Sequence, residues 1–285
     1  MTTMCDKAFA KLNLTLDVLR KREDGYHDLK SVMQTISLHD IVEVEIGTGR
    51  PWCIQCDTEG IPCDARNLAW KAAEKFCSAL QRDPDGLTIR IEKNIPSGAG
   101  MAGGSSDAAA VLRILNRFYG EPLTMEELAQ LGGAIGSDVP FCVTGGTVMC
   151  EGRGEIMRRL PDMPKCVILG CKPEFSVSTP FLFKKIDSVE IYDHPDNKGM
   201  EQAITDGNMD AIARHIYNVF EPVVSDEHEE IGHIKSVCSA YGALATQMTG
   251  SGSVVFAIMP DVDSAEKAME TLKTTYPQVF IAEPV

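Results

Sequence analysis

Alternation of apolar and polar residues predicts two strands. In residues 8–18 every second position is apolar, and Lys11 and Asn13 fall on the other face. The same period of two runs through residues 87–92, where Leu87, Ile89 and Ile91 alternate with polar residues. Because successive side chains of a strand point to opposite faces, each segment is expected to bury one face. Lys11 and Asn13 are therefore expected to be neighbours on one strand surface.

Other segments have a helical period or the composition of a buried strand. Residues 108–119 contain no Pro or Gly and are followed by Gly120, which is typical of a helix and its end. Helices are also predicted at about 67–80, 124–134 and 264–276. Strand-like runs occupy 41–57, and a buried strand is expected at 166–171. The run from Ser137 to Pro140 reads as a helix start, at which Asp138 could be a simple N-cap.

A glycine-rich loop, NIPSGAGMAGGSSDAAA at 94–110, joins the second strand to the helix at 108–119. Glycines let a backbone approach a phosphate closely, and a helix N-terminus directs unpaired N–H groups at it. Ser105 and Ser106 add hydroxyls suited to capping, to phosphate oxygens or to a metal. The segment therefore predicts an anion-binding loop, and a plain strand-to-helix connection is the structural alternative.

Two better-known phosphate loops fit this segment poorly. No Lys-Ser or Lys-Thr pair follows the glycines, which excludes the Walker pattern. Gly98, Gly100 and Gly103 match the spacing of a dinucleotide fingerprint, but a helical segment follows where that fold needs a second strand. A dinucleotide oxidoreductase is thus kept only as an alternative.

Composition limits the classes of function. The chain has 285 residues, of which 44% are hydrophobic, and a formal net charge of -14. This charge argues against a nucleic-acid or membrane-surface partner, because phosphates would be repelled. No apolar run approaches the ~20 residues of a membrane helix, and the N-terminal segment lacks a signal-peptide core, so a cytoplasmic protein is expected. Candidate local cations for an anionic substrate are Lys11, Lys93, Lys172, Lys184 and Lys185.

The ten cysteines do not predict a metal centre. Cys53, Cys56 and Cys63 form the one ligand-like cluster, and no fourth Cys or His follows at a suitable spacing. Reduced thiols in a reducing compartment account for the others. The composition also shifts near Leu160, which predicts two domains, 1–160 and 161–285.

Three separated segments resemble the motifs of one enzyme superfamily. The loop PSGAGMAGGSSDAA, AKLNL at 10–14 and TGSGS at 249–253 are similar to the three motifs of the GHMP kinases, which include galactokinase, homoserine kinase, mevalonate kinase and phosphomevalonate kinase. The segments DGYHDL at 24–29 and GSDVPF at 136–141 narrow the resemblance to the branch that acts on a cytidyl diphosphate sugar alcohol. In the loop, Met101 and Ala102 replace the more usual Leu-Gly, and Ala102 adds a Cβ without removing backbone donors.

The resemblance implies an α+β fold of two domains. A mixed-sheet N-terminal ATP-binding domain would precede a smaller α+β C-terminal domain, with the active site in the cleft between them. The implied activity is transfer of the γ-phosphoryl of ATP, with Mg²⁺, to the 2-hydroxyl of 4-diphosphocytidyl-2-C-methyl-D-erythritol, a small-molecule substrate of the non-mevalonate isoprenoid pathway. A kinase for mevalonate or homoserine, and a nucleotide-binding protein without catalysis, are the remaining alternatives. The resemblance leaves the metal ligands and the oligomeric state open.

The resemblance also assigns roles to individual residues. Asp138 would accept or orient the hydroxyl proton, and Lys11 would keep Asp138 ionised and stabilise charge on the incoming oxygen. The substrate would contact Asn13, Tyr26, His27, Thr179 and Phe183, with the cytidine held by Tyr26, His27 and Phe183. ATP would be bound by Asn67, Lys93, Pro96, Ser97, Gly98, Ala99, Gly100, Met101, Ala102, Gly103, Gly104, Ser105 and Ser106.

Overall fold

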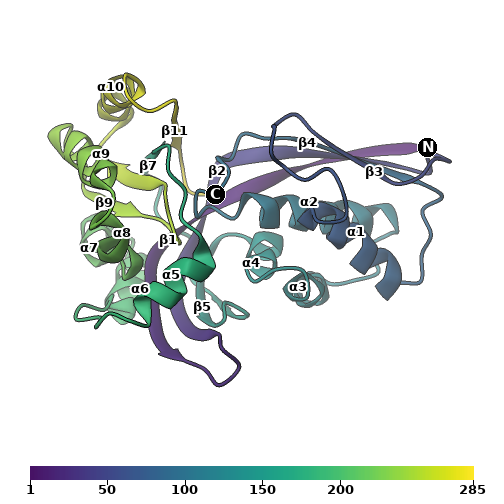
Figure 1. Ribbon diagram of the computed structural model, residues 1–285, viewed down its shortest axis with the longest axis horizontal. Coiled ribbons are helices and arrows are strands. Elements are labelled where there is room, and N and C mark those ends of the chain that lie inside the picture. The colour runs from purple at the N-terminus through teal and green to yellow at the C-terminus, as the bar shows by residue number, and fades with distance from the viewer. The chain divides into compact units, whose positions relative to one another are not determined.

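The computed structural model describes residues 1–285, in which runs of strands are separated by runs of helices (Figure 1). The chain divides into two compact units. The first comprises residues 1–10, 38–95 and 102–145, and the second comprises 11–37, 96–101 and 146–285. Two long strands, β1 (Thr2–Lys21) and β2 (His27–Ile46), contribute residues to both units. The predicted sequence boundary at residue 160 stays a prediction.

The first unit combines short strands with a group of helices. β4 (Leu87–Glu92) pairs antiparallel with residues 41–46 of β2, and β3 (Cys53–Cys56) pairs parallel with β4. The helices are α1 (Leu68–Ala79), α2 (Gly103–Phe118), α3 (Met125–Gly133) and α4 (Val139–Thr144). α1 packs along α2, and α3 packs against α4 (Figure 1). The predicted strand at 87–92 and the helices predicted at 67–80 and 124–134 are confirmed.

Local side-chain contacts explain where these helices begin and end. The Asn67 side chain accepts a hydrogen bond from the Ala69 N–H at the start of α1. Thr124 and Glu127 form a reciprocal capping box at the start of α3. Gly120, with φ of +80°, turns the chain after α2, in a conformation that glycine adopts without steric cost. α2 begins at Gly103, earlier than residue 108, because the last glycines and serines of the loop are already helical.

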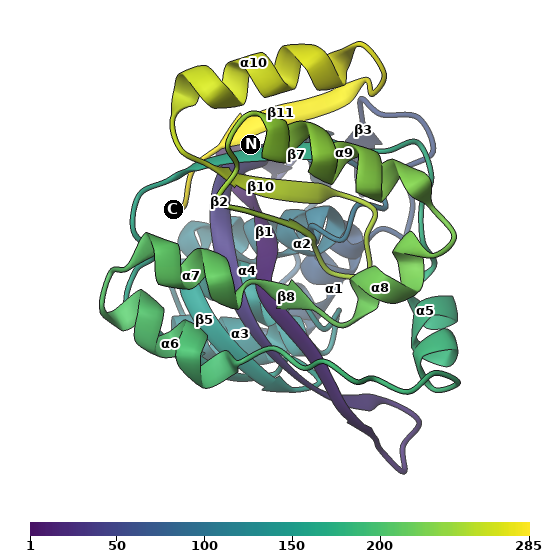
Figure 2. The same ribbon diagram turned by 90° about the vertical axis from the view of Figure 1, so that its left-hand side faces the viewer.

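The second unit contains an antiparallel sheet in the order β11-β7-β10-β9, made of Gln278–Ala282, Val167–Lys172, Val255–Met259 and Ala245–Met248. The helices α9 (Glu229–Ala240) and α10 (Val262–Lys273) pack against this sheet (Figure 2). Ile234, Ala257 and Leu272 of these elements are buried in one apolar core, which also includes Phe220. The predicted strand at 166–171 is confirmed. α10 begins two residues earlier than predicted, because the Asp261 carboxylate caps it by accepting the Ser264 N–H.

The second unit also contains strands that pair with β1 and β2, and four connecting helices. β5 (Thr147–Gly152) pairs antiparallel with β2 and with β6 (Ile156–Arg159), and the short β8 (Tyr217–Asn218) pairs parallel with β1. The connecting helices are α5 (Thr179–Ile186), α6 (Asn197–Thr205), α7 (Met209–His215) and α8 (Phe220–Ser225). Among all helices of the chain, none is both long and apolar enough to cross a membrane.

Candidate active site

The centre of the glycine loop lies against the glycine-serine turn at 249–253, within the second unit. Gly100 has φ of +75°, and a Cβ on it would lie 2.3 Å from the Thr249 carbonyl oxygen. A Cβ on Gly250 would likewise lie 2.6 Å from the Gly100 carbonyl oxygen. The Val254 N–H donates to the Ala99 carbonyl at 3.3 Å. Only glycine allows these two backbones to approach so closely.

The AKLNL motif contacts both the glycine loop and the glycine-serine turn through Lys11 and Asn13. The Lys11 N–H donates to the Met101 carbonyl at 3.2 Å, and the Asn13 N–H donates to Thr249 Oγ1 at 2.9 Å. Lys11 Nζ donates to Asn13 Oδ1 at 2.6 Å, and both side chains are buried. An ammonium has three donors, so one bond to an uncharged amide leaves Lys11 able to bind an anion. Segments from three distant parts of the sequence thus form one polar cluster in the second unit.

The end of the loop belongs to the first unit, where the two serines have different roles. Ser106 Oγ donates to the Phe9 carbonyl at 2.7 Å and is buried, so its hydroxyl is used in the fold. Ser105 Oγ lies 3.8 Å from the position of a Cβ on Gly136, two residues before Asp138. Ala102 has φ of +60°, the left-handed region that favours glycine, which explains why glycine is usual there. Ser105 is therefore the serine near the segment that carries Asp138.

Asp138 occupies the N-cap position of α4, but its side chain makes no capping hydrogen bond. Asp138 therefore stands at the N-cap position, as the simple interpretation expected, but its half-buried carboxylate does not cap the helix. Pro140 in the first turn and the Cys142 N–H bond to the Asp138 carbonyl start the helix instead. Lys11 belongs to the second unit, and its pairing with Asp138 stays a prediction.

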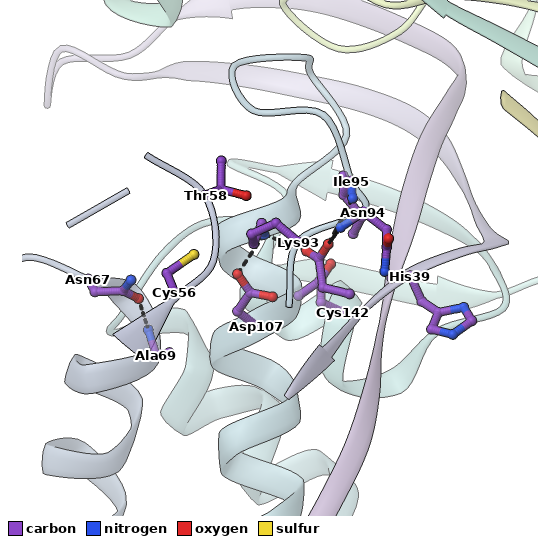
Figure 3. Close-up of polar contacts among 12 residues, drawn as sticks. His39, Cys56, Thr58, Asn67, Ala69, Lys93, Asn94, Ile95, Asp107 and Cys142 are labelled. Carbon is purple, nitrogen blue, oxygen red and sulfur yellow. Dashed lines mark hydrogen bonds and ion pairs between the residues drawn. The ribbon is translucent and has the colours of Figure 1, made fainter. Parts of the chain in front are cut away.

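The two residues predicted near the nucleotide, Asn67 and Lys93, both make local contacts in the first unit (Figure 3). The Asn67 amide caps α1 and donates to the Pro62 carbonyl at 2.8 Å. Lys93 Nζ donates to Asp107 Oδ2 at 2.7 Å and to the Asp40 carboxylate. The side chains of this triad, Asp40, Lys93 and Asp107, are at most 5% exposed.

The triad carries one positive and two negative groups. Burial, with a further contribution from the charge of Asp40, raises the pKa of Asp107 to about 7, against the opposing effect of Lys93. Burial by itself would lower the pKa of Lys93, but the two carboxylates raise it. Asp107 Oδ1 is buried without a hydrogen-bond partner. The Lys93 ammonium is thus paired with two carboxylates, and its role as a cation for an anionic substrate stays a prediction.

Sequence reasoning missed the two acids of this triad, although one left a signal. Asp40 lies on the same face of β2 as Val42, Val44 and Ile46, all of which are buried. An acidic residue at an inward position of a strand needs a buried partner. Asp40 also accepts the backbone N–H groups of Asn94 and Ile95, at 2.6 and 2.7 Å, where the chain leaves β4 and enters the loop.

The predicted cytidine residues occupy neighbouring positions in the second unit. The rings of His27 and Phe183 are stacked with centroids 4.8 Å apart, and His27 Nε2 lies 2.7 Å from Asp187 Oδ1. Tyr26 is 53% exposed, and the Arg153 guanidinium lies 3.8 Å from the centre of its ring. Thr179 Oγ1, in contrast, lies 2.9 Å from Ser251 Oγ in the glycine-serine turn.

Comparison with known families identifies this arrangement. The GHMP kinases N terminal domain matches residues 67–146, and the GHMP kinases C terminal domain matches residues 200–278. The chain belongs to the GHMP kinase family. It is therefore an ATP-dependent phosphotransferase, and the predicted α+β fold of this family is confirmed. The dinucleotide oxidoreductase alternative is wrong, because the loop of this GHMP kinase belongs to a different fold.

Full-length relatives are similar to this GHMP kinase along nearly all of its chain. A curated 4-diphosphocytidyl-2-C-methyl-D-erythritol kinase from Caldicellulosiruptor saccharolyticus is 44% identical, over 97% of this chain and 93% of the relative. The protein of the same name from Clostridium tetani is 43% identical, over 98% and 99% of the two chains. A crystal structure of 4-(cytidine 5'-diphospho)-2C-methyl-D-erythritol kinase superposes with a TM-score of 0.81 at 29% identity, over 99% of both chains. Mevalonate kinase from L. major, with a TM-score of 0.77 and 19% identity over 99% and 96% of the chains, shares the fold.

Proposed function

We propose that this kinase phosphorylates the 2-hydroxyl of 4-diphosphocytidyl-2-C-methyl-D-erythritol, giving the 2-phosphate and ADP. The observation that carries the proposal is the likeness, 44% over 97% of the chain, to a curated kinase named for this substrate. The stacked pair of His27 and Phe183 supports a substrate with a flat heterocycle. Mevalonate-type substrates are the weaker alternative, because those kinases share only the fold with this chain.

The proposed mechanism depends on positioning and charge stabilisation, since phosphoryl transfer offers a protein little covalent work. Backbone N–H groups between Gly100 and Ser106 would hold the ATP phosphates at the start of α2. Lys11, whose ammonium donates to the Asn13 amide oxygen, would stabilise the charge of the reacting oxygens. Asp138, whose carboxylate does not cap α4, would accept or orient the proton of the hydroxyl.

Mg²⁺ is proposed as the companion of ATP. Magnesium sites in kinases commonly use one or two protein oxygens together with substrate phosphates and water. No group of three or more His, Cys, Asp or Glu side chains in this chain is placed to hold a metal ion, which fits a cation delivered with the nucleotide. The Ser105 hydroxyl is the candidate protein oxygen, because the hydroxyl of Ser106 is bonded to the Phe9 carbonyl. When bound, the ion would neutralise charge on the β- and γ-phosphates.

The remaining site residues keep their predicted roles as part of this proposal. Asn13 would lie near the acceptor, while Tyr26, His27 and Phe183 would bind the cytidine. Asn67 and Lys93 would act near the nucleotide. The predicted domain division at residue 160 and the cytoplasmic location complete the proposal.

Product analysis with ATP and the cytidyl diphosphate substrate tests the function directly. We expect ADP and a 2-phosphorylated product, and turnover of mevalonate or homoserine in preference would refute the assignment. Asp138→Asn and Lys11→Met should each lower kcat by about 10²–10⁴-fold with little change in the affinity for ATP. Arg158→Gln, which alters an exposed ion pair with Glu201, is the matched control and should retain full kcat. An unchanged kcat in Asp138→Asn would remove that residue from the mechanism.

A further inference from the structure

His27 is held on two sides within the second unit. It begins β2, its side chain is 6% exposed, and one face of the ring stacks on Phe183 of α5 with an angle of 24° between the ring planes. Its Nε2 faces Asp187, the residue that ends α5, at 2.7 Å. Helix α5 and its C-terminal end therefore hold His27 in two ways. The Phe183 ring fixes the plane of the imidazole, and the Asp187 carboxylate fixes how the imidazole is turned within that plane.

The carboxylate of Asp187 is well suited to remain ionised. Hydrogen bonds from Lys21 and from His27 lower its pKa below the usual value for an aspartate. Lys21 reaches it from the end of β1, so two different strands direct donors at one acceptor. An ionised carboxylate can only accept hydrogen bonds, which means that the nitrogen facing it must carry a proton.

This contact decides the tautomer of the imidazole. In a neutral ring, a proton on Nε2 leaves a lone pair on Nδ1. Because Nε2 is engaged by Asp187, Nδ1 is the ring nitrogen left for a ligand, and it is an acceptor. A carboxylate behind a histidine commonly fixes the orientation and proton position of the ring in this way.

An acceptor at this position discriminates between pyrimidines. Cytosine presents an amino donor at C4, whereas uracil presents a carbonyl acceptor at the same place. We propose that Asp187 is a positioning residue that makes His27 select a cytidyl over a uridyl substrate. This inference rests on the proposed function, in which His27 contacts the base. Asp187 itself does not need to touch the substrate.

The test compares kcat/KM for the cytidyl diphosphate substrate and for its uridyl counterpart at pH 8. Asp187→Asn permits the other tautomer, because an amide can donate as well as accept. We expect the ratio of the two kcat/KM values to fall by about ten- to a hundredfold, mainly through KM, with kcat on the cytidyl substrate and KM for ATP nearly unchanged. Asp187→Glu keeps a carboxylate and is expected to retain most of the preference.

Two control variants separate this effect from general disturbance of the hairpin. Asp28→Asn removes another carboxylate that pairs with arginines of the same hairpin, and Lys21→Met removes the second partner of Asp187. Both should keep the ratio. The inference is overturned if Asp187→Asn keeps the wild-type ratio, or if it weakens both substrates equally, which would indicate a purely structural role. Failure of the wild type to phosphorylate the cytidyl substrate would instead refute the proposed function.

Discussion

Removal of Lys93 is the sharpest test of how the start of the glycine loop is held. Lys93→Met deletes the one cation of the buried triad and leaves Asp40 and Asp107 facing each other's charge. At an effective dielectric constant of about 20, charges 2.7 Å apart attract by about 6 kcal/mol, but desolvation of the groups offsets part of this. Breaking a buried ion pair by removing one partner typically costs about 3–5 kcal/mol.

The structure indicates how the two carboxylates will respond. Asp40 keeps the N–H groups of Asn94 and Ile95, so it remains bonded without Lys93. Asp107 loses the ammonium while its Oδ1 already lacks a partner, so it should take up a proton instead of remaining charged. Protonation is easier at low pH. The loss of unfolding free energy should therefore approach the full 3–5 kcal/mol near pH 8 and be clearly smaller near pH 5.

Urea denaturation followed by circular dichroism at both pH values measures this difference. The matched control is Lys267→Met, which removes an exposed lysine from its pair with Asp263 and should change stability little at either pH, because solvent screens an exposed pair. The double variant Lys93→Met with Asp107→Asn should recover part of the stability, because the buried carboxylate is gone. The reasoning is refuted if Lys93→Met costs no more than Lys267→Met at pH 8, or if its cost does not depend on pH.

Two further predictions concern the loop and the triad. Gly100→Ala places a Cβ 2.3 Å from the Thr249 carbonyl oxygen and should raise KM for ATP at least tenfold. Gly120→Ala is the control, because Gly120 has a similar φ but a Cβ there would meet no atom within 4 Å; it should cost only about 1–2 kcal/mol of stability and leave KM unchanged. Equal KM values for the two variants in steady-state assays would contradict the close contact. The pKa of Asp107 is raised to about 7 in the folded protein, from 3.8 for an unperturbed aspartate. Between these pH values the folded state therefore binds more protons than the unfolded state. Its contribution to stability should thus decline as pH rises from about 4 to about 7, by a few kcal/mol at most, and urea titrations of Asp107→Asn should lack this decline.

The sequence determined those features that depend on near neighbours in the chain. The alternation in residues 8–18 and 87–92 predicted β1 and β4, because the period of side chains in a strand is set by its backbone. The helices predicted at about 67–80 and 124–134 match α1 and α3, whose first turns are capped by the neighbouring residues Asn67 and Thr124. Four glycines followed by two serines predicted a phosphate loop, since its donors are backbone groups of one short segment. Resemblance of the motifs then supplied the family.

The tertiary structure decided which distant groups share an environment. Asp40 and Lys93 lie 53 positions apart, and no local pattern indicates that they form a buried ion pair. Of the two adjacent serines, only the fold shows that Ser106 is bonded to Phe9 while Ser105 lies near the segment of Asp138. The contact of Gly100 with Thr249, and that of His27 with Asp187, likewise depend on long-range packing. Local propensity fixes the period and the ends of an element, but charge neutralisation, tautomer and pKa depend on whatever the folded chain places within a few ångströms.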